Sequence, residues 1–243
     1  MFLDVFPDDE TLLDFGSTNF DLPTLESCFL DTNVIIAFLY QSDNRHLSCY
    51  NFISYLIVND IKMYISEMTV AEVINSLARA LFIDDELEAY KNQHGNLPTS
   101  NRELKNLKSR FKQNWSGQII KNDHVKLSNY NSRAIEMFAP LREICYLQNS
   151  SDQSIEVGLM LSSSVPLASS DAMIAASTIL SGSAYLISLD KDMRKLSYVT
   201  VLSTSVYNKD YNAEYMIRML GTEEFLIESL GEEEFKAKYN IAS

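Results

Sequence analysis

Short apolar runs alternate with amphipathic segments along most of this 243-residue chain. The runs of strand length are CFLD at 28–31, KMYIS at 62–66, EICYL at 143–147, AYLIS at 184–188 and YVTVL at 198–202. Between them, apolar residues recur at helical spacing, as in the series Val70, Ile74, Leu77 and Leu81. Strands that alternate with helices predict an α/β fold, in which a mainly parallel sheet is covered on both faces.

The same pattern divides the chain into three parts. We expect an acidic N-terminal arm at 1–27, an α/β domain at 28–202 and an acidic helical C-terminal extension at 203–243. Within the α/β domain, polar and basic sequence replaces the alternation from about 84 to 126. This stretch is predicted to be a basic helical insertion.

The net charge of −13 argues at first against a nucleic-acid partner, but its distribution changes that interpretation. Residues 1–27 hold seven acids and no Lys or Arg, whereas residues 91–126 hold eight Lys or Arg and only two acids. We therefore expect nucleic-acid contacts in the insertion, at Lys105, Lys108, Arg110, Lys112 and Trp115. A solvated helical face remains the simpler explanation of the basic residues, and Trp115 could equally anchor the insertion to a core.

Composition narrows the class of protein further. The three cysteines are odd in number, far apart and set in apolar sequence, so neither a disulfide framework nor a zinc knuckle is indicated. No apolar run approaches the roughly 20 residues of a membrane helix, and the acidic N-terminus is unlike a signal peptide. We therefore expect a cytoplasmic protein with no membrane partner.

Acidic residues stand where ligands bind in a parallel sheet, beyond the carboxyl ends of the strands. Asp31 ends the first predicted strand, and Glu72 lies in the helix after the second. Asp171 opens a later helix, which Ser169 or Ser170 could cap, and Asp190 ends the fourth strand with Asp192 two residues on. Clustered carboxylates repel one another unless a cation holds them, and oxygen ligands favour Mg²⁺ or Mn²⁺.

The segments FLDTNVIIAFL, SEMTVAEVINSLAR, SSDAMIAAS and YLISLDKDM, in this order, resemble the PIN-domain ribonucleases. That family includes the toxins of many bacterial toxin–antitoxin modules. The resemblance covers about 28–202 apart from the insertion, and it implies a PIN-like three-layer α/β/α sandwich. It places four acids at the metal-binding positions of the family, Asp31, Glu72, Asp171 and Asp190. Thr32 and Asn33 match the polar pair beside the first acid, and Ser170 matches the small hydroxyl before the third.

The resemblance implies an endoribonuclease that uses Mg²⁺ or Mn²⁺ to hydrolyse RNA phosphodiester bonds. An antitoxin-like protein and a second copy of the chain are the further partners it suggests. Two features depart from the family pattern. Glu72 and Asp171 are 99 residues apart, which is long for a compact toxin, and the sequence LDKDM offers both Asp190 and Asp192 as the fourth acid.

Other interpretations remain open for the same residues. Asp31 could be only a helix cap at a strand end, because Asp is favoured at that position. The run FLDTN is also similar to the haloacid-dehalogenase phosphatases, although those need a second Asp where Asn33 stands. A third alternative keeps the PIN-like fold as a nucleic-acid-binding or protein-binding module with a weak metal site.

Overall fold

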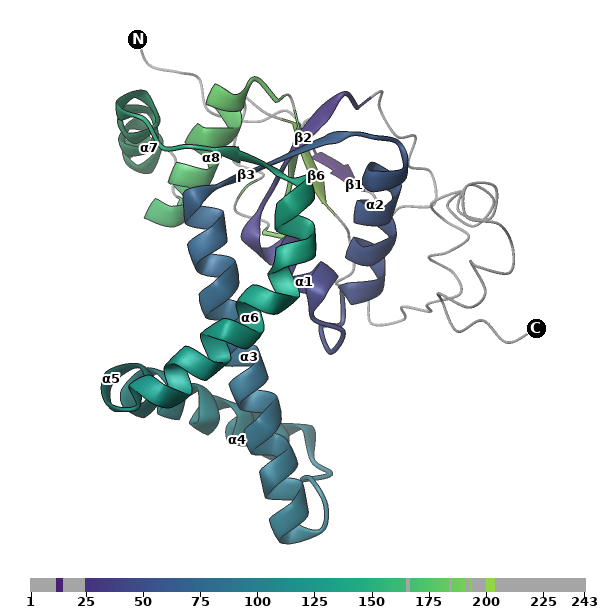
Figure 1. Ribbon diagram of the computed structural model, residues 1–243, viewed down its shortest axis with the longest axis vertical. Coiled ribbons are helices and arrows are strands. Elements are labelled where there is room, and N and C mark those ends of the chain that lie inside the picture. The colour runs from purple at the N-terminus through teal and green to yellow at the C-terminus, as the bar shows by residue number, and fades with distance from the viewer. Residues whose placement is uncertain are drawn as a thin grey trace, which may run out of the picture. The chain divides into compact units, whose positions relative to one another are not determined.

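The computed structural model describes residues 25–164, 167–183, 185–190 and 193, together with the backbone of 12–14 and 200–203 (Figure 1). The chain forms two compact units. We call Met1–Val70 with Ile144–Ser243 the sheet unit, and Ala71–Glu143 the helical unit. The predicted C-terminal extension, apart from Ser203, lies outside the described residues, as does most of the predicted N-terminal arm.

The sheet unit is built on six described strands that pair in parallel. The strands are β1 (Leu12–Asp14), β2 (Ser27–Leu30), β3 (Lys62–Ser66), β4 (Tyr146–Gln148), β5 (Tyr185–Ile187) and β6 (Thr200–Ser203). Their order across the sheet is β1-β6-β5-β2-β3-β4, so β2 is central, between β5 and β3. The α/β class with a parallel central sheet is therefore confirmed.

Four helices lie wholly within the sheet unit, namely α1 (Thr32–Leu39), α2 (His46–Val58), α7 (Asp152–Ser164) and α8 (Ser169–Ser181). The connection from β2 through α1 and α2 leads to β3, whereas the connection from β4 through α7 and α8 leads back across the sheet to β5. Right-handed crossovers that run in opposite directions place their helices on opposite faces of a sheet. The result is the three-layer α/β/α arrangement that the sequence predicted.

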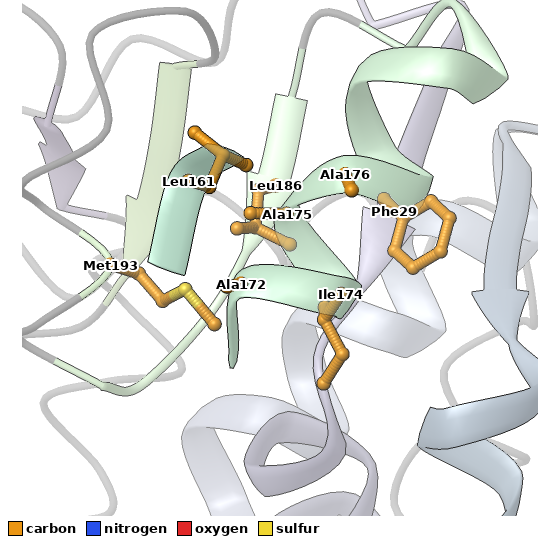
Figure 2. Close-up of a cluster of buried hydrophobic side chains, with 8 residues drawn as sticks. All are labelled: Phe29, Leu161, Ala172, Ile174, Ala175, Ala176, Leu186 and Met193. Atoms are coloured by element: carbon orange, nitrogen blue, oxygen red, sulfur yellow. The ribbon is translucent and has the colours of Figure 1, made fainter. Parts of the chain in front are cut away.

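A hydrophobic cluster joins α8 to the two central strands (Figure 2). It consists of Phe29, Leu161, Ala172, Ile174, Ala175, Ala176, Leu186 and Met193. The small alanines let α8 approach the sheet closely, and a Cβ added to Gly158 of α7 would overlap Sδ of Met173 in α8. Tight packing of this kind fixes α8, and with it the position of Asp171 at the start of that helix.

The helical unit has its own core. Its elements are the main part of α3 (Glu67–His94), α4 (Asn101–Asn114), the π-helix η2 (Trp115–Ile119), α5 (Ile120–Asn122) and most of α6 (His124–Ile144). Trp115 is 1% exposed, and its ring centroid lies 5.5 Å from that of Phe82 and 6.0 Å from that of Tyr130. Beside this core, Arg133 Nη1 lies 2.6 Å from Asp85 Oδ2, which also accepts a hydrogen bond from the Tyr130 hydroxyl.

Several predicted element boundaries change in the structure. Glu143 and Ile144 belong to α6 and not to the third strand, since β4 begins at Tyr146. No break occurs near residue 84, because α3 continues without interruption to His94. Leu12–Asp14, in the predicted arm, adds an edge strand beside β6.

The cysteines are core thiols. Cys28, Cys49 and Cys145 are all buried and none forms a disulfide. Burial raises the pKa of the Cys28 thiol well above its ordinary value, and nearby Cys145 adds to this effect. Burial also raises the pKa of Cys49 to about 12. Both thiols therefore stay protonated at neutral pH, which makes them poor nucleophiles and metal ligands.

Candidate active site

Asp31 follows directly after the central strand β2 and is 3% exposed. Its carboxylate has donors at both oxygens: the backbone N–H of Thr32 lies 2.7 Å from Oδ1, and the hydroxyl of Ser188 lies 2.5 Å from Oδ2. Asp31 is also the N-cap residue of α1, so the capping role considered for it is real. These contacts compensate for the loss of hydration that burial imposes on a carboxylate.

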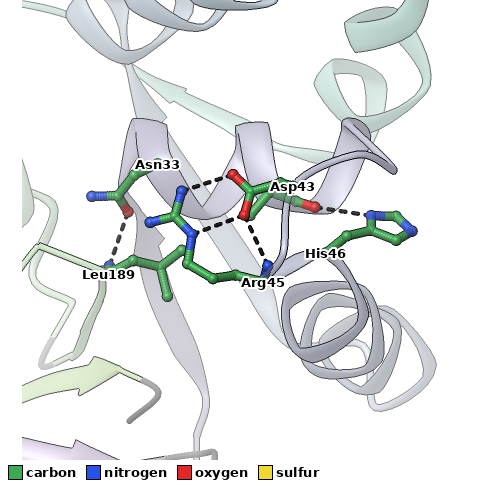
Figure 3. Close-up of polar contacts among 6 residues, drawn as sticks. Asn33, Asp43, Arg45, His46 and Leu189 are labelled. Atoms are coloured by element: carbon green, nitrogen blue, oxygen red, sulfur yellow. Dashed lines mark hydrogen bonds and ion pairs between the residues drawn. The ribbon is translucent and has the colours of Figure 1, made fainter. Parts of the chain in front are cut away.

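Ser188 links the ends of β2 and β5. Its Oγ donates to Asp31 and accepts a hydrogen bond from the backbone N–H of Asp190 at 3.0 Å. A second link runs in parallel, because Asn33 Oδ1 accepts from the backbone N–H of Leu189 at 2.9 Å (Figure 3). Asp31 and Asn33 therefore together hold the segment 188–190 against the start of α1.

The topology of the sheet makes this edge the expected place for a ligand. From β2 the chain passes to β3, its neighbour on one side. From β5, the neighbour of β2 on the other side, the chain passes to β6, which lies still farther from β2. The connections diverge between β2 and β5, whose final residues Leu30 and Ile187 are in register. In open α/β sheets, ligands bind in the crevice at such a divergence, outside the carboxyl ends of the strands. Asp31 and Asp190 stand at that place.

The far end of α1 is also fixed. His46 Nδ1 lies 2.9 Å from the carbonyl oxygen of Ala37, and Arg45 forms a two-point ion pair with Asp43 (Figure 3). Partial burial acts to raise the pKa of Asp43, but the hydrogen bonds and charge of Arg45 outweigh it and hold that pKa below its ordinary value. Asp43 is therefore ionised at neutral pH and keeps Arg45 in place.

Asp171 lies in the first turn of α8 and is half-buried, as is its neighbour Ser170. The predicted serine cap is wrong. Ala168 is the N-cap residue, and both Ser169 and Ser170 lie inside the helix. Because α8 runs antiparallel to the strands it packs on, its first turn lies towards the carboxyl edge of the sheet, on the same side as Asp31.

The remaining predicted acids are less closely defined. Glu72 lies half-buried near the start of α3, in the helical unit. Asp192 lies outside the described residues. Within the part of the chain that the structure describes, no three His, Cys, Asp or Glu side chains form a group that could hold a metal ion. The four-acid site accordingly remains a prediction.

The chemistry of Asp31 nevertheless suits a hard cation. The side chains at this edge offer carboxylate, hydroxyl and amide oxygens as metal ligands. Mg²⁺ and Mn²⁺ prefer oxygen ligands of this kind. The type of oxygen ligand at this edge is therefore the type that such a cation requires, and the full set of ligands stays a prediction.

The predicted RNA-contacting residues separate into three environments. Lys105, Lys108 and Lys112 are exposed and spaced i, i+3 and i+7, which places them on one face of α4. Arg110 is exposed but lies outside that spacing. Trp115 is buried against Phe82 and Tyr130, so the anchoring alternative holds and the ring is not available to stack on a base.

Sequence reasoning missed Ser188. Ser188 is fully buried and forms hydrogen bonds with the Asp31 carboxylate and the Asp190 backbone. The sequence pattern shows it only as part of an apolar strand. The available signal was a lone hydroxyl residue in the run YLISLD, two positions before an acid at a strand end. Buried hydroxyls need a partner, so such a residue points to a polar group on the neighbouring strand.

Two solved structures have a distant likeness to this chain over about three quarters of its length. No curated protein matches the chain. Among solved structures, VapBC2 from Rickettsia felis, solved with a DNA fragment from its promoter, is 10% identical with a TM-score of 0.43. The match covers 73% of this chain and 98% of that one. FitAcB from Neisseria gonorrhoeae is 18% identical with a TM-score of 0.38, over 72% of this chain and 96% of that one.

The described part of the chain has no helix that is both long and apolar enough to cross a bilayer.

The family model of the PIN domain matches residues 28–114, a range that includes Asp31, Thr32, Asn33 and Glu72. Asp171 and Asp190 lie beyond the matched range. The resemblance to the PIN-domain family, first inferred from the acidic motifs, is confirmed by this match.

Proposed function

We propose that this protein is a divalent-metal-dependent ribonuclease that hydrolyses RNA phosphodiester bonds. The site is built on Asp31, with Asp171, Asp190 and Glu72 as its other acids. The observation that carries the proposal is the environment of Asp31, a buried carboxylate at the divergence of β2 and β5. A capping role alone does not explain why Ser188, at the end of the neighbouring strand, donates a second hydrogen bond to the Asp31 carboxylate.

Asp31, Asp171 and Asp190 would hold a Mg²⁺ or Mn²⁺ ion. When bound, such an ion lowers the pKa of a coordinated water molecule and neutralises charge on the scissile phosphate. The protein's own part is to keep the ligands in place before substrate arrives. Ser188 and the Thr32 N–H fix the rotamer of Asp31, and Asn33 fixes the segment that carries Asp190.

Glu72 is the residue we assign to orienting or deprotonating the attacking water, because no histidine is among the candidate residues. Its exposure supports this role, since a half-buried carboxylate on a helix can reach both solvent and a substrate. RNA binding is assigned to the lysine face of α4, formed by Lys105, Lys108 and Lys112. Three exposed ammonium groups in one row suit the phosphates of a single strand.

The direct test is an RNA cleavage assay on the purified full chain. Single-stranded and hairpin RNAs of about 20 nucleotides are incubated with Mg²⁺, Mn²⁺ or a chelator. We expect cleavage of the single-stranded RNA that stops with the chelator and returns when the metal is restored. A single-stranded DNA of the same sequence is the control for sugar specificity. Failure to cleave any RNA with either metal, by protein that is folded by circular dichroism, would refute the proposal.

A further inference from the structure

A pocket of about 730 Å³ lies in the helical unit, where α3 ends and α4 begins. Six of its lining residues are Tyr90, His94, Glu103, Asn106, Leu107 and Arg110. The first two come from the last turns of α3, and the other four come from one side of α4. A volume of this size is ample for a ligand as large as a nucleotide.

One wall of the pocket is aromatic. The rings of Tyr90 and His94, one helical turn apart on α3, have centroids separated by 4.2 Å and planes inclined by 36°. His94 is exposed and Tyr90 is half-buried, so the ring pair faces accessible space. Aromatic side chains of this kind are the surfaces on which unpaired bases stack.

The side of the pocket that α4 forms carries a cation. Glu103, Asn106 and Arg110 are spaced i, i+3 and i+7 on α4, so all three point to the same side of that helix. The ion pairs found in the described part of the chain use Arg45, Lys126 and Arg133, and the Arg110 guanidinium is exposed. A guanidinium binds phosphate with two parallel hydrogen bonds.

The other two polar groups restrict what the pocket can accept. Asn106 can both donate and accept hydrogen bonds, as the edge of a nucleobase requires. Glu103 only accepts, so it suits a base amino group or a ribose 2′-hydroxyl. The negative charge of Glu103 also repels the several charges of a triphosphate. The pocket therefore favours a ligand that has a single phosphate next to each base.

We infer that this pocket binds one unpaired nucleotide of the RNA strand. The base stacks on the Tyr90 and His94 rings, and Arg110 binds the adjoining phosphate. This inference rests on the proposed ribonuclease function, and it assigns a strand contact separate from the lysine face of α4. It also gives a role to Arg110, which the spacing of Lys105, Lys108 and Lys112 leaves outside that face.

The position of the pocket on α3 sets a length requirement for the substrate. Tyr90 follows Glu72 by 18 residues on the same helix, which is about 27 Å at 1.5 Å per residue. A stacked strand advances about 3.4 Å per nucleotide, so about eight nucleotides cover that distance. An RNA of four nucleotides cannot contact Glu72 and the pocket together, whereas one of 20 nucleotides can.

The test compares a tetranucleotide with a 20-nucleotide single-stranded RNA as substrates. The variants are Tyr90→Ala, Arg110→Gln and the conservative Tyr90→Phe. Lys121→Gln is the matched control, because Lys121 is an exposed cation of α5 that neither lines the pocket nor belongs to the lysine face. We expect Tyr90→Ala and Arg110→Gln to raise KM for the 20-mer about tenfold with kcat unchanged. Tetranucleotide cleavage, Tyr90→Phe and Lys121→Gln should match the wild type.

An unchanged KM in both pocket variants would overturn the inference while leaving the ribonuclease proposal intact. An equal rise with Lys121→Gln would also overturn it, because general charge would then explain the effect. Adenosine 5′-monophosphate serves as the free-nucleotide probe. Tight binding of this probe that the pocket variants abolish, with no change in KM for the 20-mer, would assign the pocket to free nucleotides and overturn the strand contact.

If the wild type cleaves no RNA, the ribonuclease proposal fails, and the inference is decided by binding instead. Fluorescence anisotropy of the labelled 20-mer then measures Kd for the same variants without metal. A tenfold weaker Kd for Tyr90→Ala and Arg110→Gln, but not for Lys121→Gln, supports the pocket. Equal Kd values for wild type, Tyr90→Ala and Arg110→Gln overturn it.

Discussion

The hydroxyl of Ser188 donates to the carboxylate of Asp31 across 2.5 Å, and this contact joins the ends of the neighbouring strands β5 and β2. The same hydroxyl accepts from the backbone N–H of Asp190. One buried side chain thus fixes the first acid of the candidate site and the backbone that carries another. Polar groups that position a metal ligand in this way affect both stability and metal affinity.

Replacing Ser188 with Ala should therefore destabilise the protein by about 1–3 kcal/mol, because a buried carboxylate loses a donor and a backbone N–H loses an acceptor. Urea unfolding followed by circular dichroism measures this change. Ser163→Ala is the control, since Ser163 is exposed and its hydroxyl bonds only to a backbone carbonyl. A loss as small as that of the control would show that the Ser188 contact does not support the site.

Asn33 should act through the acceptor that it offers to the Leu189 N–H. Asn33→Ala removes the acceptor and is expected to cost about 1 kcal/mol of unfolding free energy. Asn122→Ala is the control, because Asn122 is exposed at the end of α5. A loss no larger than that of the control, measured by urea unfolding, would show that the Asn33 hydrogen bond does not stabilise the fold.

The ion pair of Asp43 with Arg45 predicts a pH dependence of stability. Because the pKa of Asp43 is lowered in the folded protein from an ordinary value of 3.8, the ionised form stabilises the fold above that value. This contribution is lost as the pH falls below about 4 and through the lowered pKa. Unfolding free energies of wild type and Asp43→Asn should therefore differ at pH 7 and converge towards pH 2. A difference that stays constant over this range would contradict the assignment.

Trp115 is the one tryptophan of the chain, so its fluorescence reports on the helical unit. Its burial against Phe82 and Tyr130 predicts blue-shifted emission that RNA does not quench. Trp115→Ala should destabilise the protein by about 3–5 kcal/mol through the cavity it leaves. Trp115→Phe should cost less, because the indole Nε1 is buried without a hydrogen-bond partner among the described residues. RNA-dependent quenching would show that the ring contacts substrate.

The lysine face of α4 should control the salt dependence of RNA binding. A triple variant with Gln at Lys105, Lys108 and Lys112 should have a shallower slope of log K against log salt concentration. The slope should become less negative by about 2, since each phosphate contact contributes about 0.7 for a single strand. Arg102→Gln supplies the single-charge control on the same helix. A slope that does not change would return these lysines to the role of solvated surface.

Much of the sheet unit could be predicted from the sequence, because strands buried in a parallel sheet are short apolar runs with clear ends. The runs that contain β2 and β3 are of this kind, and Asp31 stands out because an acid follows an apolar strand directly. The run EICYL predicted a strand that began too early. Ile144 lies in the last turn of α6 and is 46% exposed, so its hydrophobic character alone indicated the strand.

The helical unit was harder to predict. The acids that follow Phe82 suggested the start of an insertion, yet Phe82 and Leu87 are both buried and continue the apolar side of α3. Helix spacing separates Arg110 from Lys105, Lys108 and Lys112, whereas the charge pattern alone groups all four residues. Contacts between distant segments, such as Ser188 with Asp31, have no periodic signal in a single sequence.

The central claim is that Asp31 belongs to the catalytic site and does not only cap α1. The most direct measurement is kcat for single-stranded RNA cleavage by Asp31→Asn, with saturating Mn²⁺, against wild type and Asp60→Asn. Asp60 is exposed, and its positive φ of 54° is a conformation that Asn also adopts readily, so the control changes one carboxylate without strain. We predict that Asp31→Asn, folded by circular dichroism, loses at least about a hundredfold in kcat while Asp60→Asn keeps wild-type activity. Wild-type kcat in folded Asp31→Asn would contradict the assignment.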